Sequence, residues 1–243
     1  PAAKVPLIAV PTTAGTGSEA TIVAVLTDPD THIKRSIRHP TFMPRQVILD
    51  PQLMARMPRR VLAAAGMDAL TQAYESYVSR TATDFTRALS EMALVTIVRS
   101  LPPLYHGNQA AAGAMLQASF IAGLALSHAR LGLVHGLAYP LGARWNVPHG
   151  QVCALCLPHV LRFNADAVPK AHQILRARLK RPLEEIVVEF NRDLRVRNPF
   201  SGSMLKDVQE ILDETLSSGS TAANPRAVKE SDVMTILMRL FEA

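Results

Sequence analysis

Aromatic side chains and cysteines are both scarce in this sequence. Phe, Trp and Tyr make up 5% of the 243 residues, so the core has to be built mainly from aliphatic side chains and Met. Such a composition, rich in Ala and Leu, favours packed helices. The two cysteines, Cys153 and Cys156, form an isolated C-x-x-C. Without a second pair or a thioredoxin-like context, they are predicted to be small buried hydrophobes and not a zinc or redox site. So few cysteines suit a reducing compartment, and we predict a cytoplasmic protein.

The sequence also lacks any basic cluster of the kind that binds nucleic acid. Its formal net charge is +6, but the densest basic stretches, at residues 34–38 and 176–181, contain no interleaved aromatics. We therefore expect no nucleic-acid partner. The uncharged run at residues 110–127 is long enough to span a membrane. Its polar and alanine content weakens that interpretation, so we predict a buried central helix and no membrane association.

Two regions follow one another along the chain. Short apolar runs at residues 7–10, 22–26 and 47–49 predict strands, and this region resembles the last piece of an α/β domain. The pattern then becomes helical. Helices are predicted at residues 60–78, 84–100, 110–130, 132–141 and 150–163, and about three weaker ones follow. The second helix is expected to end before Pro102 and Pro103.

Asp68 and Gln72 lie four residues apart in GMDALTQAYE, on the first long predicted helix. This spacing places both side chains on one face, one turn apart. Such pairs are common on exposed helices, but the neighbouring residues here are mostly Ala, Leu and Met. A carboxylate in so apolar a helix is unfavourable unless it is paired, hydrogen-bonded or bound to a metal. This helix is therefore a candidate for one part of a buried polar site.

Two histidines, His135 and His149, occur in GLVHGLAYPLGARWNVPHG, and each is followed by a glycine. Glycine next to a histidine leaves room for a ligand or for another backbone. One histidine in such a place is more often a hydrogen-bonded core residue than a ligand. Two of them and an acidic helix suggest a metal site. Their spacing alone does not bring them together, so both interpretations stay open at this point.

Several motifs, taken in order, resemble the iron-containing (group III) alcohol dehydrogenase family. They are PTTAGTGSEAT, LDP, GMDAL, GLVHG and PHG within residues 10–164, and NPRAV near the end. The resemblance implies a mainly α fold. Residues 55–243 would form a dehydroquinate synthase-like helical domain that binds a metal and carries the catalytic site. Residues 1–54 would be the C-terminal remnant of an α/β nucleotide-binding domain.

The function implied by the resemblance is that of an NAD(P)-dependent alcohol dehydrogenase. Such an enzyme transfers a hydride between a nicotinamide cofactor, NAD or NADP, and a small alcohol, aldehyde or ketone, with help from a divalent metal ion. Dimerisation is an expectation of the family. The family's upstream domain also has a GGGS-type loop that holds the pyrophosphate, and this sequence has none. We therefore expect the chain to be truncated or part of a longer protein, and incomplete as an enzyme by itself.

The metal ligands implied by the resemblance are an Asp, a His one turn later and two further histidines, which bind one iron or zinc ion. Asp68, His135 and His149 take three of these places, and Gln72 stands where many members have the second ligand. An amide oxygen is a weaker and harder donor than imidazole. Tyr139 stands where many relatives have another active-site histidine. A phenol can donate a hydrogen bond to the substrate, but its ordinary pKa of about 10 makes it a poor proton relay at neutral pH. A packing role for Tyr139 stays open.

The loop at residues 12–21 is implied to contact the cofactor. Its hydroxyls and glycines can approach a dinucleotide closely, although it fits neither the Rossmann fingerprint nor the P-loop. The residues assigned to the cofactor by resemblance are Thr12, Thr13, Thr16, Thr21 and Lys34. Lys34 would lie near the ribose, and a solvated lysine is the alternative.

Two alternatives to the alcohol dehydrogenase prediction remain. Maleylacetate reductases share the architecture but replace the metal-binding Asp, so Asp68 argues against such a relative. The second alternative is a non-catalytic or degenerate fragment of the same fold, which Gln72, Tyr139 and the absent pyrophosphate loop would suit. Metal analysis distinguishes the two classes.

Overall fold

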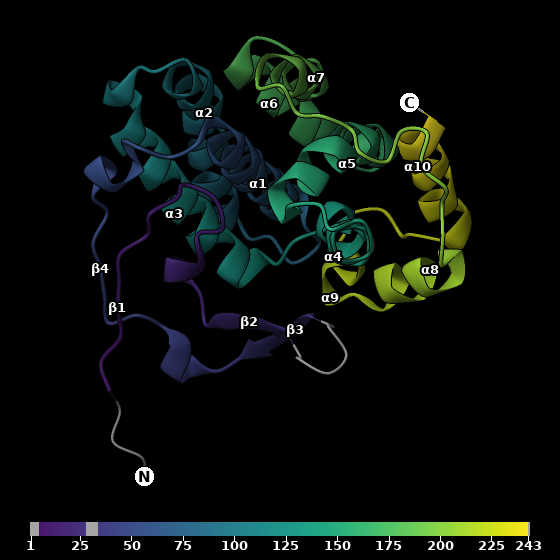
Figure 1. Cartoon of the computed structure of the whole chain (residues 1–243), viewed down its shortest axis with the longest axis horizontal. Helices are drawn as coiled ribbons and strands as arrows, with labels where there is room; N and C mark the ends of the chain where they lie inside the picture. The colour runs from purple at the N-terminus through teal and green to yellow at the C-terminus, as the bar shows by residue number, and fades with distance from the viewer. Residues whose placement is uncertain (1–4, 28–33, 243) are drawn as a thin grey trace.

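The structure is a computed structural model, and it describes residues 5–27 and 34–242 (Figure 1). The strands are β1 (Ile8–Ala9), β2 (Val23–Thr27), β3 (Lys34–Arg38) and β4 (Gln46–Val47). The helices are α1 (Arg59–Val78), α2 (Asp84–Tyr105), α3 (Ala112–Ala129), α4 (Leu133–Trp145), α5 (His149–Asn164), α6 (Pro169–Leu179), α7 (Leu183–Asp193), α8 (Val208–Ser217), α9 (Gly219–Ala222) and α10 (Glu230–Glu242). The predicted mainly α fold is confirmed.

The N-terminal segment forms two separate pairs of strands. β1 and β4 are parallel, with Ile8 opposite Gln46. β2 and β3 form an antiparallel hairpin, with Val23 opposite Arg38. Leu7 and Ile8 are exposed, so within the described residues no other element packs over these two apolar side chains at β1. A parallel pair this short does not form an independent sheet.

The long helices fall close to their predicted positions, but the prediction was wrong in three places. α2 does not end before its prolines and continues through Pro102 and Pro103 to Tyr105. Leu101 and Leu104 are buried, so packing of this last turn outweighs the backbone hydrogen bonds that the prolines remove. α4 runs to Trp145 and includes Pro140. Five helices, α6 to α10, follow α5 where about three were expected.

The core is built around α1, which packs against α2, α3 and α5. Met67, Leu70 and Tyr74 of α1 are fully buried. The apolar segment Gln109–Ala129, which includes α3, is long enough to cross a membrane. However, α3 packs against α1 and α2, and 44% of the most apolar 18-residue stretch of the segment is buried. A helix of this kind is common in the core of a globular protein, so α3 is explained by packing.

Glycines allow two other segments to approach α1 closely at neighbouring residues. A Cβ on Gly150, in the first turn of α5, would lie 2.0 Å from the carbonyl oxygen of Ala64. A Cβ on Gly15, in the threonine-rich loop, would lie 2.9 Å from the Cβ of Ala65. The start of α5 and this loop are therefore both fixed to the same turn of α1, one turn before Asp68.

Candidate metal centre

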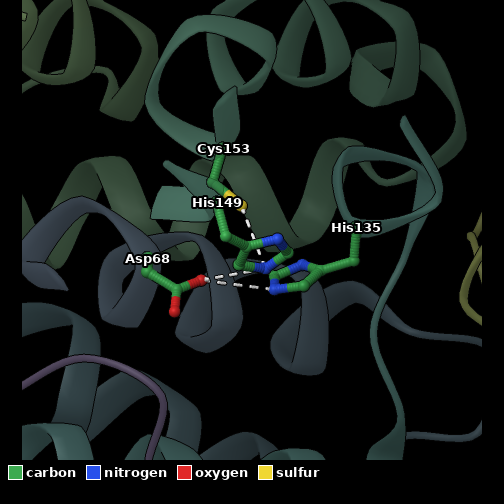
Figure 2. A group of neighbouring side chains, drawn as sticks. All are labelled: Asp68, His135, His149 and Cys153. Atoms are coloured by element: carbon green, nitrogen blue, oxygen red, sulfur yellow. Dashed lines mark hydrogen bonds and ion pairs between the residues drawn. The ribbon is translucent and has the colours of Figure 1, made fainter. Parts of the chain in front are cut away.

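Three side chains predicted to form a site come together from three helices. Asp68 lies on α1, His135 on α4 and His149 at the start of α5 (Figure 2). Asp68 Oδ1 lies 3.4 Å from His135 Nε2 and 3.7 Å from His149 Nε2. Asp68 and His135 are buried, and the His149 side chain is 28% exposed. Folding therefore joins the residues that sequence spacing alone left unconnected.

Glu75 fixes the orientation of His135. Its Oε2 accepts a hydrogen bond of 2.6 Å from His135 Nδ1, and its Oε1 accepts one of 2.6 Å from the backbone N–H of Val134. Because a carboxylate can only accept, Nδ1 carries the hydrogen and Nε2 faces Asp68. Glu75 thus satisfies a free N–H in the first turn of α4 and orients the His135 ring with the same carboxylate.

Gly132 makes room for this arrangement. It precedes α4, and a Cβ at this position would lie 2.8 Å from Glu75 Oε1 and 3.1 Å from Asn224 Oδ1. Asn224 Oδ1 also accepts a hydrogen bond from the backbone N–H of Leu133. The first turn of α4, which carries His135, is therefore held by side chains from α1 and from the segment before α10.

The electrostatics of the group favour a positive charge. Burial by itself disfavours charge on His135, but the carboxylates of Glu75 and Asp68 outweigh it and raise the pKa of His135 to about 9. Burial likewise opposes charge on Asp68, but His135 and His149 outweigh it and hold the pKa of Asp68 below its usual range. Two buried carboxylates beside two imidazoles therefore attract either a proton or a metal cation.

Gln72 is buried on the same face of α1, one turn after Asp68. Its amide nitrogen Nε2 donates a hydrogen bond of 3.1 Å to Asp68 Oδ2. The oxygen Oε1 is buried and has no hydrogen-bond partner. In this arrangement Gln72 supports the carboxylate of Asp68 through the oxygen that does not face His135.

Sequence analysis missed Cys153, which belongs to the same group. Donor atoms of Asp68, His135, His149 and Cys153 all lie within 4.8 Å of one another. Cys153 Sγ lies 3.7 Å from His149 Nε2 (Figure 2). Burial raises the pKa of the Cys153 thiol well above its usual value, and the carboxylates of Asp68 and Glu75 add to this effect. The predicted burial of both cysteines is confirmed, and the H-x-x-x-C spacing, one helical turn, is the sequence signal that places Cys153 on the same face as His149.

Tyr139 lies at the edge of the group. It is one turn after His135 on α4, and its ring centroid lies 5.1 Å from that of His149. The residue is 36% exposed. Burial of part of the ring, with Asp68 and Cys153 nearby, raises the pKa of its phenol above the usual value. The phenol therefore keeps its proton at neutral pH and can donate a hydrogen bond.

The threonines of the loop differ in how available their hydroxyls are. Thr12 and Thr16 are exposed and Thr13 is half-buried. Thr21 is buried: its Oγ1 donates to the Ser18 carbonyl and accepts from the Val23 N–H. In this geometry the Thr21 hydroxyl stabilises the backbone of the loop. The side chain of Lys34 lies outside the described part of the chain.

The donor set fits a divalent cation. Asp68 Oδ1 and His135 Nε2 are both buried and make no hydrogen bond, and they face each other as an ion pair at 3.4 Å. A buried polar atom without a partner is unfavourable, and a cation between these two atoms would satisfy both. Two clefts of about 370 and 290 Å³ are lined by other residues. The candidate site is therefore identified from the chemistry of its side chains and not from a cleft. The fold and the site together define a mainly helical protein with a buried group of side chains of the types that bind metal ions.

Comparisons with known proteins agree with this class. Residues 62–241 match the family described as "Fe-containing alcohol dehydrogenase family, C-terminal", and residues 1–51 match "Iron-containing alcohol dehydrogenase". Lactaldehyde reductase of Escherichia coli (strain K12) is 34% identical over 96% of this chain and 65% of its own length. The chain belongs to the iron-containing alcohol dehydrogenase family.

Solved structures show the same fold. A 1,3-propanediol oxidoreductase superposes with a TM-score of 0.91 and 32% identity over 97% of this chain and 66% of its own. A sulfoacetaldehyde reductase from Bifidobacterium kashiwanohense, in complex with NAD+, superposes with a TM-score of 0.90 and 27% identity over 97% and 65% of the two chains. The dehydroquinate synthase-like helical fold predicted from the sequence is confirmed. The chain spans slightly less than two thirds of the length of these relatives.

Proposed function

We propose that this chain forms the metal-binding side of an NAD(P)-dependent alcohol dehydrogenase that interconverts a small alcohol and its aldehyde or ketone. In the oxidative direction a hydride leaves the alcohol carbon for the nicotinamide ring, and the hydroxyl proton is released to solvent. The observation that supports this most strongly is the convergence of buried Asp68 Oδ1 and His135 Nε2, without hydrogen-bond partners, in a fold of this family. Relatives with reductase names support the substrate class.

Asp68, His135 and His149 would hold the cation in this proposal. When bound, the cation supplies Lewis-acid chemistry, which polarises a substrate oxygen and lowers the pKa of an alcohol. Glu75 keeps Nε2 of His135 directed at the site through its hydrogen bond to Nδ1. Gln72 acts by orienting Asp68, since its Nε2 donates to Asp68 Oδ2.

Tyr139 would face the substrate. It is partly exposed beside His149, and its phenol stays protonated at neutral pH, so it can donate a hydrogen bond to the substrate oxygen. Thr12, Thr13 and Thr16 would contact the cofactor from the loop that packs on Ala65 of α1. In this proposal residues 1–54 supply one wall of the nucleotide site and residues 55–243 supply the metal side. Two buried free thiols suit a reducing cytoplasm.

Metal content tests the proposal. We expect about one equivalent of iron or zinc per purified chain by inductively coupled plasma mass spectrometry, and loss of that metal in His135→Ala and His149→Ala. His149→Ala changes a partly exposed side chain, so it should disturb folding less than His135→Ala. Far-ultraviolet circular dichroism checks that both variants are folded. His128→Ala, at an exposed position on α3, is the control that should keep its metal.

Turnover is measured by the appearance of reduced nicotinamide with short-chain alcohols and NAD+ or NADP+. It is followed in this chain and in a form extended to the length of the relatives, because the chain covers 65% of such a relative. A folded protein with no bound metal and no nucleotide binding in either form would refute the dehydrogenase assignment and support the non-catalytic alternative.

A further inference from the structure

A thiol lies among the donors of the proposed metal centre, and the sequence resemblance has no place for it. Cys153 lies one helical turn after His149 on α5, so both side chains extend from the same face of that helix. Figure 2 shows Cys153 Sγ directed at the His149 ring, and Sγ lies 3.7 Å from Nε2 of that ring. Cys153 is fully buried. Its donor atom, like those of Asp68, His135 and His149, lies within 4.8 Å of every other donor in the group.

Gln72 stands where the resemblance places a second metal ligand, but its side chain has a different partner. Gln72 directs Nε2 at Asp68 Oδ2, at 3.1 Å. An amide nitrogen has no free lone pair for a metal, and the remaining oxygen, Oε1, is a weaker and harder donor than the imidazole that the resemblance places here. Gln72 therefore supports Asp68 and leaves three conventional donors. The resemblance implies four protein ligands, so this set is one donor short.

Three of the separations between the donors are close to those around a single tetrahedral ion. With bonds of about 2.0–2.1 Å to N or O and about 2.3 Å to S, tetrahedral ligands lie about 3.4 Å apart for N/O pairs and about 3.6 Å apart for N–S pairs. The structure has 3.4 Å between His135 Nε2 and Asp68 Oδ1 and 3.7 Å between His149 Nε2 and Asp68 Oδ1. It has 3.7 Å between His149 Nε2 and Cys153 Sγ. All the remaining pairs of donor atoms lie within 4.8 Å of one another, so the four donors need only draw together to reach one ion.

We propose that Cys153 is the fourth metal ligand and replaces the imidazole that Gln72 cannot supply. The inference rests on the proposed metal centre and specifies its ligand set as Asp–His–His–Cys. The thiol loses its proton to solvent as the sulfur–metal bond forms. A thiolate is a soft donor that suits zinc, and ferrous iron lies near the weak end of the general order of divalent-metal affinities, so the set favours zinc over ferrous iron.

X-ray absorption of the zinc-loaded chain tests this directly. We expect one sulfur at about 2.3 Å in the shell of bound zinc, beside three N or O donors at about 2.0–2.1 Å. The cobalt-substituted chain should show a thiolate-to-cobalt charge-transfer band in the near ultraviolet. Both signals should disappear in Cys153→Ala.

Cys156→Ala is the matched control. Cys156 is also fully buried, on the same helix, and its sulfur is not among the clustered donors. It should keep the sulfur signal and the wild-type affinity. Cys153→Ala should weaken zinc binding by more than about 100-fold in chelator competition, because losing a residue that merely orients a ligand already costs about 10–100-fold. Adding Gln72→His to Cys153→Ala should recover affinity without the sulfur signal.

The outcomes separate the two proposals. Bound zinc with only N and O donors in the wild type, or a sulfur signal that persists in Cys153→Ala, overturns the role of Cys153 and leaves the metal centre standing. A folded wild-type chain that binds neither zinc nor cobalt overturns both.

Discussion

Replacing Glu75 by Gln removes a buried charge from beside His135 with almost no change in side-chain size. The wild-type carboxylate accepts two hydrogen bonds of 2.6 Å, from His135 Nδ1 and from the Val134 N–H. An amide offers one oxygen and one NH₂, so it cannot accept from both donors through separate oxygens. One donor is left without its partner, and a hydrogen bond to a charged group is worth about 1.5–3 kcal/mol.

The pH dependence of stability gives this prediction its sharpest form. Burial lowers the pKa of His135, but Glu75 and Asp68 outweigh it and raise that pKa from 6.5 to about 9. A raised folded-state pKa stabilises the fold fully below the unfolded-state pKa, and this contribution is lost as the pH rises through the folded-state value. At about 1.36 kcal/mol per pH unit, the wild-type chain treated with chelator should lose about 3 kcal/mol from this group between pH 6.5 and pH 9.

Urea unfolding followed by circular dichroism at both pH values measures the effect. Glu75→Gln should be less stable at pH 6.5 and should lose clearly less stability on going to pH 9. Its zinc affinity should fall by about 10–100-fold, since His135 is no longer held in orientation. If Glu75→Gln showed the same loss of stability with pH as the wild type, the assigned coupling between Glu75 and His135 would be wrong.

Two further substitutions test the packing and the edge of the site. Gly150→Ala should destabilise the chain by about 1–3 kcal/mol in thermal or urea unfolding, because its Cβ would lie 2.0 Å from the Ala64 carbonyl oxygen. Gly113→Ala is its control on α3, since the nearest atom would lie 3.9 Å away, and equal stability losses in the two variants would contradict the close approach of α5 to α1. Tyr139→Phe should keep the metal, fold normally and lower kcat by about 10-fold or more in the extended form, as one substrate hydrogen bond is lost; unchanged kcat would leave Tyr139 a packing residue.

The architecture was largely predictable because it depends on local patterns. The apolar, Ala-rich segments have helical periodicity and length, so α1, α3 and α5 could be placed within a residue or two. The end of α2 could not be predicted from its prolines, because burial of Leu101 and Leu104 decides whether that turn stays helical. Local propensity and tertiary packing give opposite answers there, and packing prevails.

The sequence by itself determined which residue types were available for the site, and it indicated Asp68, His135 and His149 through their unusual surroundings and their family motifs. Only the tertiary structure decided which atoms meet. Glu75 reaches His135 only because the first turn of α4 lies against α1, and Gln72 is directed by its hydrogen bond to Asp68 Oδ2. Cys153 enters the group because α5 approaches α1 closely at Gly150, which sets the height and rotation of that helix. Spacing along one helix fixes a shared face, but the convergence of side chains from three helices depends on how the whole core packs.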